Sequence, residues 1–247
     1  MSDSCFEVEA STCRMGVSLE DAVTLVLEED NTNADMIRII LATRRPELPD
    51  MLEGSLHSAL AHAEACVVDD LASLLSAVST GRAADVVVLF DLATPTLAGL
   101  AGLLYLRLQR PGVPVVVIST TNCSTAMRAC IETGAAGCVC PDADSDLLHE
   151  AIHMVLDGEI WASAELDLAG APNPEVAATL RRLASLTPQQ LRVLTMLFQN
   201  LLNKQIAFEL NVSEATVKAH VSAILQKLDV EGRAQAVDAV SSLTGAG

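Results

Sequence analysis

Two patterns of apolar positions divide the chain. Between residues 36 and 163, short apolar runs alternate with segments of helical spacing, whereas beyond residue 185 only the helical spacing remains. The short runs are MIRIILA, EACVV, DVVVLF, VPVVVIS and GCVC. Val86 to Phe90 is apolar without alternation, which is typical of strands that helices cover on both faces. The first pattern therefore predicts a parallel sheet between two helical layers.

Two segments outside these patterns complete the predicted organisation. Residues 1–35 hold one Arg and nine acidic residues, and only VSLEDAVTLVLEE has helical spacing, so we expect an acidic extension. Residues 164–185 contain Gly, Pro and Asn before a short helical stretch, which is typical of a linker. The α/β domain is then expected at 36–163 and a helical domain at 186–247.

The helical domain begins with a strong start signal. Thr187 can cap a helix whose first residue is Pro188, where the missing N–H costs nothing. A second helix is expected from Asn203 to Leu210, a third from its cap at Ser213 to Leu228, and a fourth from Gly232 to Leu243. The domain should therefore be all-α with four helices.

The third of these helices has one apolar face and one face of small side chains. The apolar positions are Val217, Val221, Ile224, Leu225 and Leu228, and those opposite are Ala215, Ala219, Ser222 and Gln226, flanked by Thr216 and Lys218. In a helix-turn-helix the second helix of the pair enters the major groove, and small side chains allow close approach. We expect this helix to read duplex DNA, with Lys218 as its one long cationic side chain.

The charge distribution limits DNA contact to the C-terminal part. Residues 1–180 hold 8 Lys and Arg and 27 Asp and Glu, net −19, whereas residues 181–247 hold 7 and 5, net +2. Phosphates need a positive potential, so only the second part can approach DNA closely. With one Trp, one Tyr and four Phe, stacking on single strands is not expected. The chain has no apolar run of about 18 residues and acids where a signal peptide has bases, which predicts a cytoplasmic protein without a membrane partner.

The segment from LTPQQLRVL onward resembles the DNA-binding domain of LuxR/FixJ-type regulators. The matching positions are Leu186, Thr187, Asn203, Lys204, Ile206, Ala207, Leu210, Ser213, Thr216, Val217, Lys218, His220, Leu225, Lys227, Leu228 and Ala236. The resemblance implies that Lys218, Ala219 and Ser222 face bases, and that Asn203, Lys204, Ser213 and Thr216 face phosphates. It further implies a homodimer, formed through the last helix, on paired half-sites of double-stranded DNA.

The α/β part resembles a response-regulator receiver in DVVVLFDLATP, VPVVVISTTN and IETGAAGCVC. This resemblance implies a flavodoxin-like doubly wound fold with strand order 2-1-3-4-5. It places Asp91 at the phosphoacceptor position and Ser119 at the switch hydroxyl. Thr43 and Arg44 stand where receivers carry the acidic pair that binds Mg²⁺, and the Lys after the fifth strand is missing. We therefore expect no bound metal or cofactor and no phosphoryl transfer to Asp91. Arg44 is expected to form an ion pair with Asp91 instead. The alternative is an ordinary phosphorylation-dependent regulator.

Asp69 and Asp70 are expected to be surface acids. They precede Asp91 by only 21 residues, which leaves no room for the elements that separate the acidic pair from the phosphoacceptor in receivers.

Cys123, Cys130, Cys138 and Cys140 lie along the fourth-strand to fifth-strand region, through which receivers dimerise. These cysteines could form a redox-controlled interface, and the alternative is that they are small buried hydrophobes. His149 and His153 have the spacing to share a metal, or are solvated.

Two other classes of function, a sequestering interaction protein and an enzyme, can be compared with DNA binding on the same sequence. The acidic front half could bind and sequester another regulator, which makes a protein partner at the receiver-like domain an alternative use of that surface. An enzyme is not expected, because the sequence lacks a Gly-rich phosphate loop and a nucleophile–base constellation. The expected function is thus a sequence-specific transcriptional regulator.

Overall fold

The computed structural model describes residues 37–52, 63–80, 85–119, 124–140, 145–162 and 173–244. The helix expected within the acidic extension lies outside these ranges, as does Cys123. The boundaries of the extension and of the linker therefore stay predictions.

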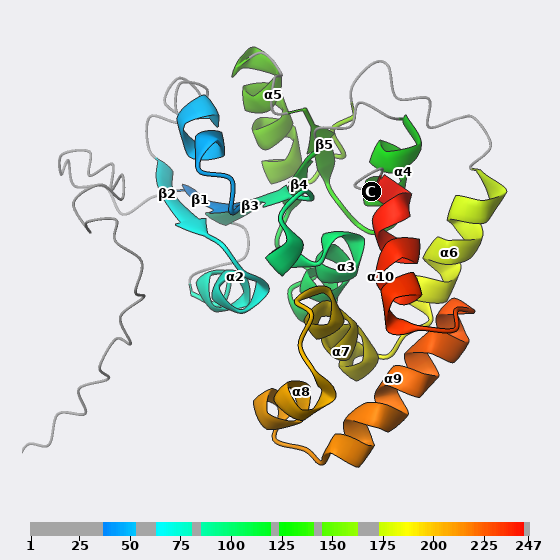
Figure 1. Cartoon of the computed structure of the whole chain (residues 1–247). Coiled ribbons are helices and arrows are strands. Elements are labelled where there is room, and N and C mark those ends of the chain that lie inside the picture. Colours follow the sequence, from blue (N-terminus) through cyan, green and yellow to red (C-terminus); the bar gives the residue numbers. More distant parts are fainter. Residues whose placement is uncertain are drawn as a thin grey trace, which may run out of the picture.

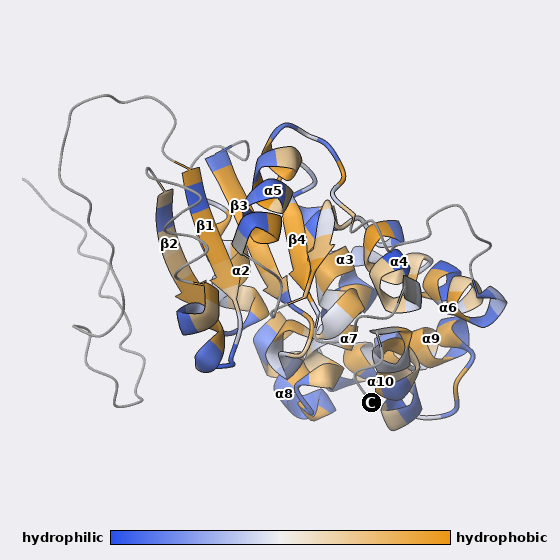
Figure 2. Ribbon diagram, turned by 90° about the horizontal axis from the view of Figure 1, so that it is seen from above, coloured by the Kyte–Doolittle hydropathy of each residue, from blue (hydrophilic) through white to orange (hydrophobic). Residues whose placement is uncertain are grey.

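Five parallel strands form one sheet in the order β2-β1-β3-β4-β5 (Figure 1). The strands are β1 (Ile37–Ala42), β2 (Ala63–Val68), β3 (Val86–Asp91), β4 (Val115–Ile118) and β5 (Gly137–Val139). Both the order and the parallel pairing confirm the doubly wound fold that the sequence predicts. Figure 2 shows the central strands coloured almost entirely as hydrophobic, and every residue of β3 is buried.

Helices cover both faces of this sheet, which explains the absence of alternation in β3. Val88 and Phe90 point into one apolar cluster, and Val87 and Leu89 into another on the opposite face. The elements of the first face are α2 (Leu71–Ala77), α3 (Gly99–Gln109) and α4 (Ser124–Glu132), and those of the second are a short helix at 47–52 and α5 (Ser145–Leu156). A 3-10 turn, η2 (Pro95–Leu97), joins β3 to α3.

The C-terminal part is helical, as predicted. Its elements are α6 (Pro174–Ala184), α7 (Pro188–Phe198), α8 (Asn203–Leu210), α9 (Glu214–Leu228), α10 (Arg233–Ser241) and the 3-10 turn η3 (Ser242–Thr244). Thr187 and Gln190 form a reciprocal capping box at the start of α7, with contacts of 3.3 and 3.0 Å. Ser213 Oγ accepts a hydrogen bond from Thr216 N at 3.1 Å and so caps α9. The expected helix starts are confirmed.

The helical part packs against the α3 and α4 side of the sheet (Figure 1). Helix α7 lies on α3 and η2, α10 contacts α3, and η3 contacts α4. One cluster of buried apolar side chains includes Leu97 and Leu100 on the sheet side together with Leu191 and Leu194 of α7. Within the predicted linker, α6 is capped by Asn173 and contacts both α4 and α9. None of the described helices has the length and apolar character to cross a bilayer.

Candidate nucleic-acid interface and Asp91 site

Helix α9 presents the predicted reading face to solvent. Val217, Ile224 and Leu228 are buried and anchor the helix, while its principal neighbours are α6, α7, α8 and α10. The side chains expected to face bases, Lys218, Ala219 and Ser222, are all exposed. The face is therefore open for contact with another molecule while the two parts of the chain are packed together.

The residues expected to face phosphates lie around the helix-turn-helix corner. Lys204, Ser213 and Thr216 are exposed, and the hydroxyls of Ser213 and Thr216 lie 2.8 Å apart. Asn203 is half-buried at the start of α8, and its Oδ1 is buried without a hydrogen-bond partner in the part of the chain that the structure describes. Backbone-contacting side chains usually fix the register of a helix on DNA, and these positions suit that task.

A residue that the sequence analysis did not single out contacts Lys218. The carboxylate of Glu214, in the first turn of α9, lies 3.1 Å from the Lys218 ammonium, with side chains 49% and 65% exposed. The i to i+4 spacing of Glu and Lys was the available signal. The pair neutralises part of the only long cationic side chain on the reading face.

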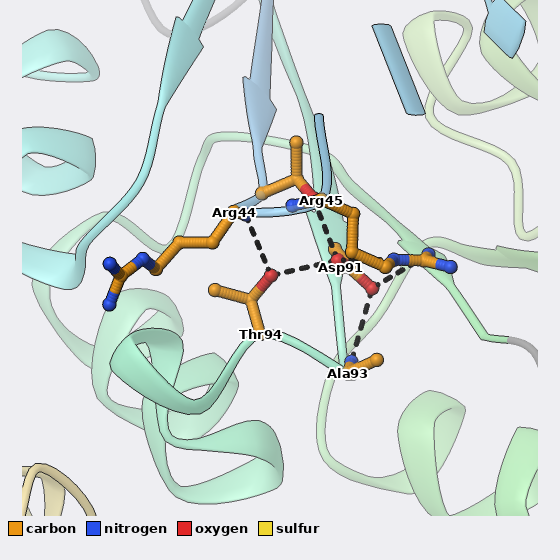
Figure 3. A network of polar contacts seen from close by, with 6 residues as sticks. Arg44, Arg45, Asp91, Ala93 and Thr94 are labelled. Atoms are coloured by element: carbon orange, nitrogen blue, oxygen red, sulfur yellow. Dashed lines mark hydrogen bonds and ion pairs between the residues drawn. The ribbon is translucent and has the colours of Figure 1, made fainter. Parts of the chain in front are cut away.

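Asp91 ends β3 at the carboxyl edge of the sheet, where its side chain is fully buried. Its Oδ2 accepts hydrogen bonds from Thr43 Oγ1 (2.7 Å), Thr94 Oγ1 (2.8 Å) and Arg45 Nε (3.0 Å). Its Oδ1 accepts from Arg45 Nη2 (3.0 Å) and Ala93 N (3.1 Å), as Figure 3 shows in part. A carboxylate offers about four lone-pair positions, so these five donors saturate it.

The expected ion pair between Arg44 and Asp91 is wrong, because Arg45 supplies the guanidinium. Arg45 donates to both oxygens of the Asp91 carboxylate in a bidentate contact, whereas the exposed side chain of Arg44 points away from the site (Figure 3). The backbone N of Arg44 instead donates to Thr94 Oγ1 at 3.0 Å. The two arginine side chains leave the chain in different directions after β1, and only that of Arg45 faces Asp91 (Figure 3).

The other predicted positions of the receiver-like part fall in two groups. Ser119 follows β4, is buried, and its backbone N donates to Val139 O at 3.0 Å. Asp91 and Ile118 are paired in register, so Ser119 lies on the same edge of the sheet as Asp91. Asp70 caps α2 by accepting from Ser73 N at 2.8 Å, and Asp69 is exposed. Asp69 is thus a surface acid, as predicted, whereas Asp70 is half-buried and serves as a helix cap.

Of the cysteines that the structure describes in this region, Cys130 and Cys138 lie in the interior, contrary to the hypothesis of a redox-controlled surface. Cys130 and Cys138 are 0% and 1% exposed and belong to the apolar cluster between the sheet and α4. A hydrogen bond with Cys138 and burial raise the pKa of the Cys130 thiol well above its ordinary value, which disfavours the reactive thiolate. Cys140 is half-buried. Redox control stays a prediction that this placement does not favour.

The two histidines of α5 lie side by side, with ring centroids 4.4 Å apart. Among the described residues, no group of three or more His, Cys, Asp or Glu side chains is arranged to hold a metal ion. In that part of the chain, His149 and His153 therefore have no third metal-ligating side chain arranged beside them.

Comparison with known proteins relates both parts of the chain to one family. The family model described as bacterial regulatory proteins, luxR family, matches residues 184–240. The glycerol metabolism activator of Pseudomonas putida is 33% identical over 209 residues, which cover 82% of this chain and 94% of that protein. The nitrate/nitrite response regulator protein NarL of Escherichia coli K12 is 33% identical over 151 residues, 60% of this chain and 70% of that protein.

Among solved structures, response regulator ChrA of a heme-sensing two-component system is similar at 25% identity and a TM-score of 0.41, covering 84% of this chain and 98% of that one. The match to the activator spans nearly its whole length, and the family model covers α7, α8 and α9, the last of which is the helix predicted to read DNA. The chain belongs to the LuxR family of bacterial response regulators and is a DNA-binding transcriptional regulator.

Proposed function

We propose that this regulator acts in the cytoplasm as a dimer on paired half-sites of promoter DNA, and that Arg45 rather than phosphoryl transfer sets the state of its receiver. The observation that carries the second part is the saturated carboxylate of Asp91. A lone pair that already accepts a hydrogen bond is unavailable to attack a phosphorus atom or to bind a cation.

The surroundings of Asp91 add an electrostatic argument. A transferred phosphoryl group brings concentrated negative charge, and receivers balance it with Mg²⁺ held by several carboxylates. Thr43 and Arg44 supply none, and the guanidinium of Arg45 already balances the single charge of Asp91. Mg²⁺ gives up its bound water reluctantly, so a single buried carboxylate does not offset the cost of dehydrating the ion at this site.

We expect Asp91 to remain unmodified when the protein is incubated with acetyl phosphate and Mg²⁺. Intact mass spectrometry measures the modification, and a response regulator that retains the acidic pair is treated in parallel as the positive control. DNA affinity should be the same with and without the phosphodonor. A stable added phosphoryl group that changes DNA affinity would restore the phosphorylation-dependent reading.

The DNA-binding part of the proposal rests on the open face of α9. Small side chains at Ala215 and Ala219 allow close approach to base edges, and Lys218 reaches the hydrogen-bond acceptors of guanine. The resemblance to LuxR/FixJ-type regulators implies that the last helix forms the dimer interface. In this structure, however, α10 contacts α3, and η3 contacts α4. A dimer through this helix therefore requires the two domains to separate first.

Changing Glu214 to Gln is expected to raise DNA affinity about two- to fivefold. The substitution removes an ion pair worth roughly 0.2–0.5 kcal/mol, frees the Lys218 ammonium, and removes a negative charge from a surface that faces phosphates. Fluorescence anisotropy with a promoter duplex at fixed salt measures the change. Glu209→Gln in α8 provides a control with the same loss of charge outside the Lys218 pair. An unchanged or lower affinity for the Glu214 variant would show that the ion pair does not restrain Lys218.

A further inference from the structure

The loop between β3 and α3, residues 92–98, is bonded directly to the Asp91 site. Thr94 Oγ1 donates to Asp91 Oδ2 at 2.8 Å and accepts a hydrogen bond from Arg44 N at 3.0 Å. The next contact is made by Ala93 N, which donates to Asp91 Oδ1 at 3.1 Å. Thr94 is 1% exposed, so water cannot readily replace these bonds. The position of the Asp91 carboxylate thus sets the path of the loop.

The same loop has a conformation that depends on its surroundings. Ala98 lies in the left-handed region at φ 61° and ψ 30°, which is unfavourable for a residue with a Cβ atom. The loop also lies unusually close to α3: a Cβ atom at Gly102 would lie 1.6 Å from Leu97 O. Both Leu97 and Ala98 are fully buried. Packing and the bonds of Thr94, rather than local preference, hold this loop in place.

On its other side the loop contacts the DNA-binding domain. Thr96 O accepts a hydrogen bond from Gln199 Nε2, at the end of α7, with a distance of 3.4 Å. Helix α7 packs on η2 as well as on α3. Leu97 of the loop belongs to the same buried cluster as Leu194 and Leu197 of α7. Only one residue separates the side chain bonded to Asp91 from the carbonyl bonded to α7.

We propose that Thr94 and residues 95–98 transmit the state of the Asp91 site to α7, so that loss of the Asp91–Thr94 bond releases the DNA-binding domain from the receiver. Release frees α10 and η3, which now contact α3 and α4. The reading face of α9 is exposed while the domains are packed together, so release changes the assembly on DNA rather than access to α9. Only this last consequence rests on the proposed dimer.

The test is Thr94→Val in the full chain, which removes the hydroxyl and keeps the shape of the side chain. Small-angle X-ray scattering measures the ratio of extended to packed molecules, and circular dichroism confirms that the variant is folded. We expect the ratio to rise about tenfold or more, because a hydrogen bond to a charged group is lost. Thr94→Ser retains the hydroxyl and should match the native protein.

Thr133→Val in the same domain is the matched control. It also removes a buried threonine hydroxyl, one that donates to Ala129 O at 2.6 Å, outside the β3–α3 loop. Its scattering should equal that of the native chain. Equal release in the Thr133 and Thr94 variants, or unchanged scattering in the Thr94 variant, would overturn the proposal.

A second variant, Gln199→Ala, tests the route through the loop. Alone it should give a smaller release, since the bond it removes is exposed and long. Added to Thr94→Val it should change little, because the loop has already lost its contact with α7; additive effects would mean that the two sites act independently. Should Thr94→Val fail to fold, absence of any release in Gln199→Ala would count against the proposal. No arm measures DNA affinity, so a failure of DNA binding would leave this result intact.

Discussion

Replacing Arg45 with alanine is expected to lower the free energy of unfolding by about 3–5 kcal/mol, the usual cost of leaving one partner of a buried ion pair without the other. Asp91 is fully buried, and its carboxylate would lose two of its five hydrogen-bond donors together with the only guanidinium bonded to it among the described residues. Urea unfolding, followed by the fluorescence of the buried Trp161, measures the change.

Two further variants separate the ion pair from a general effect of losing an arginine. Arg44→Ala removes the adjacent, exposed guanidinium and should change the unfolding midpoint little. Asp91→Asn added to Arg45→Ala should restore much of the loss, because a neutral amide needs no opposite charge. Equal costs for Arg44→Ala and Arg45→Ala would contradict the assignment of Arg45 as the partner of Asp91.

Replacing Lys218 with alanine is expected to weaken binding to promoter DNA by roughly 1–3 kcal/mol, about five- to 150-fold, because the reading half of α9 has no other long cationic side chain. Anisotropy titrations at several salt concentrations measure both the affinity and its salt dependence. If Lys218 contacts a base edge, its loss should lower affinity most for the preferred sequence. If Lys218 contacts a phosphate, its loss should lower affinity for all sequences alike.

Arg181→Ala is the matched control, since it removes an exposed positive charge from α6 rather than from the reading helix. Its effect should be limited to a small change common to all duplexes. If Lys218→Ala and Arg181→Ala were indistinguishable on the preferred sequence, α9 would not be the helix that reads DNA.

The C-terminal helices could be predicted closely because their signals are local. Thr187 with Pro188, and Ser213, mark the starts of α7 and α9 through contacts within three residues of the chain. The apolar face of α9 follows directly from its spacing, and the exposed face is what remains. Capping and periodicity require no knowledge of distant segments, so the sequence alone suffices for this part of the site.

The alternation of strands and helices implies a helix between β3 and β4, but no apolar stripe marks the bounds of α3, and its burial explains why. GLAGLLYLRLQ is apolar on nearly every side and has no clear helical stripe, because the helix lies between the sheet and the C-terminal helices. A surface helix can be recognised because polar residues on its outer face alternate with apolar residues on its inner face. Helix α3 has no polar outer face over most of its length.

The Asp91 partner also depended on distant contacts. Thr43 and Arg44 could be recognised as unsuitable for Mg²⁺ from residue type alone, but the choice between Arg44 and Arg45 is decided by the path of the chain after β1. Cys130 illustrates the same limit, since its helical position turns the thiol into the core beside Cys138. Residue chemistry is readable from the sequence, whereas the direction of a side chain beyond an element's end is not.

The buried cluster that joins α3 to α7 restricts how this regulator can change over evolution. Leu97 and Leu100 of the receiver and Leu191 and Leu194 of the DNA-binding domain share one apolar interior. Proteins whose domains have separate interiors can exchange one domain for another with little loss. Here a substituted receiver would need a surface that fits α7, so the two domains are expected to be inherited, and to vary, as a single unit.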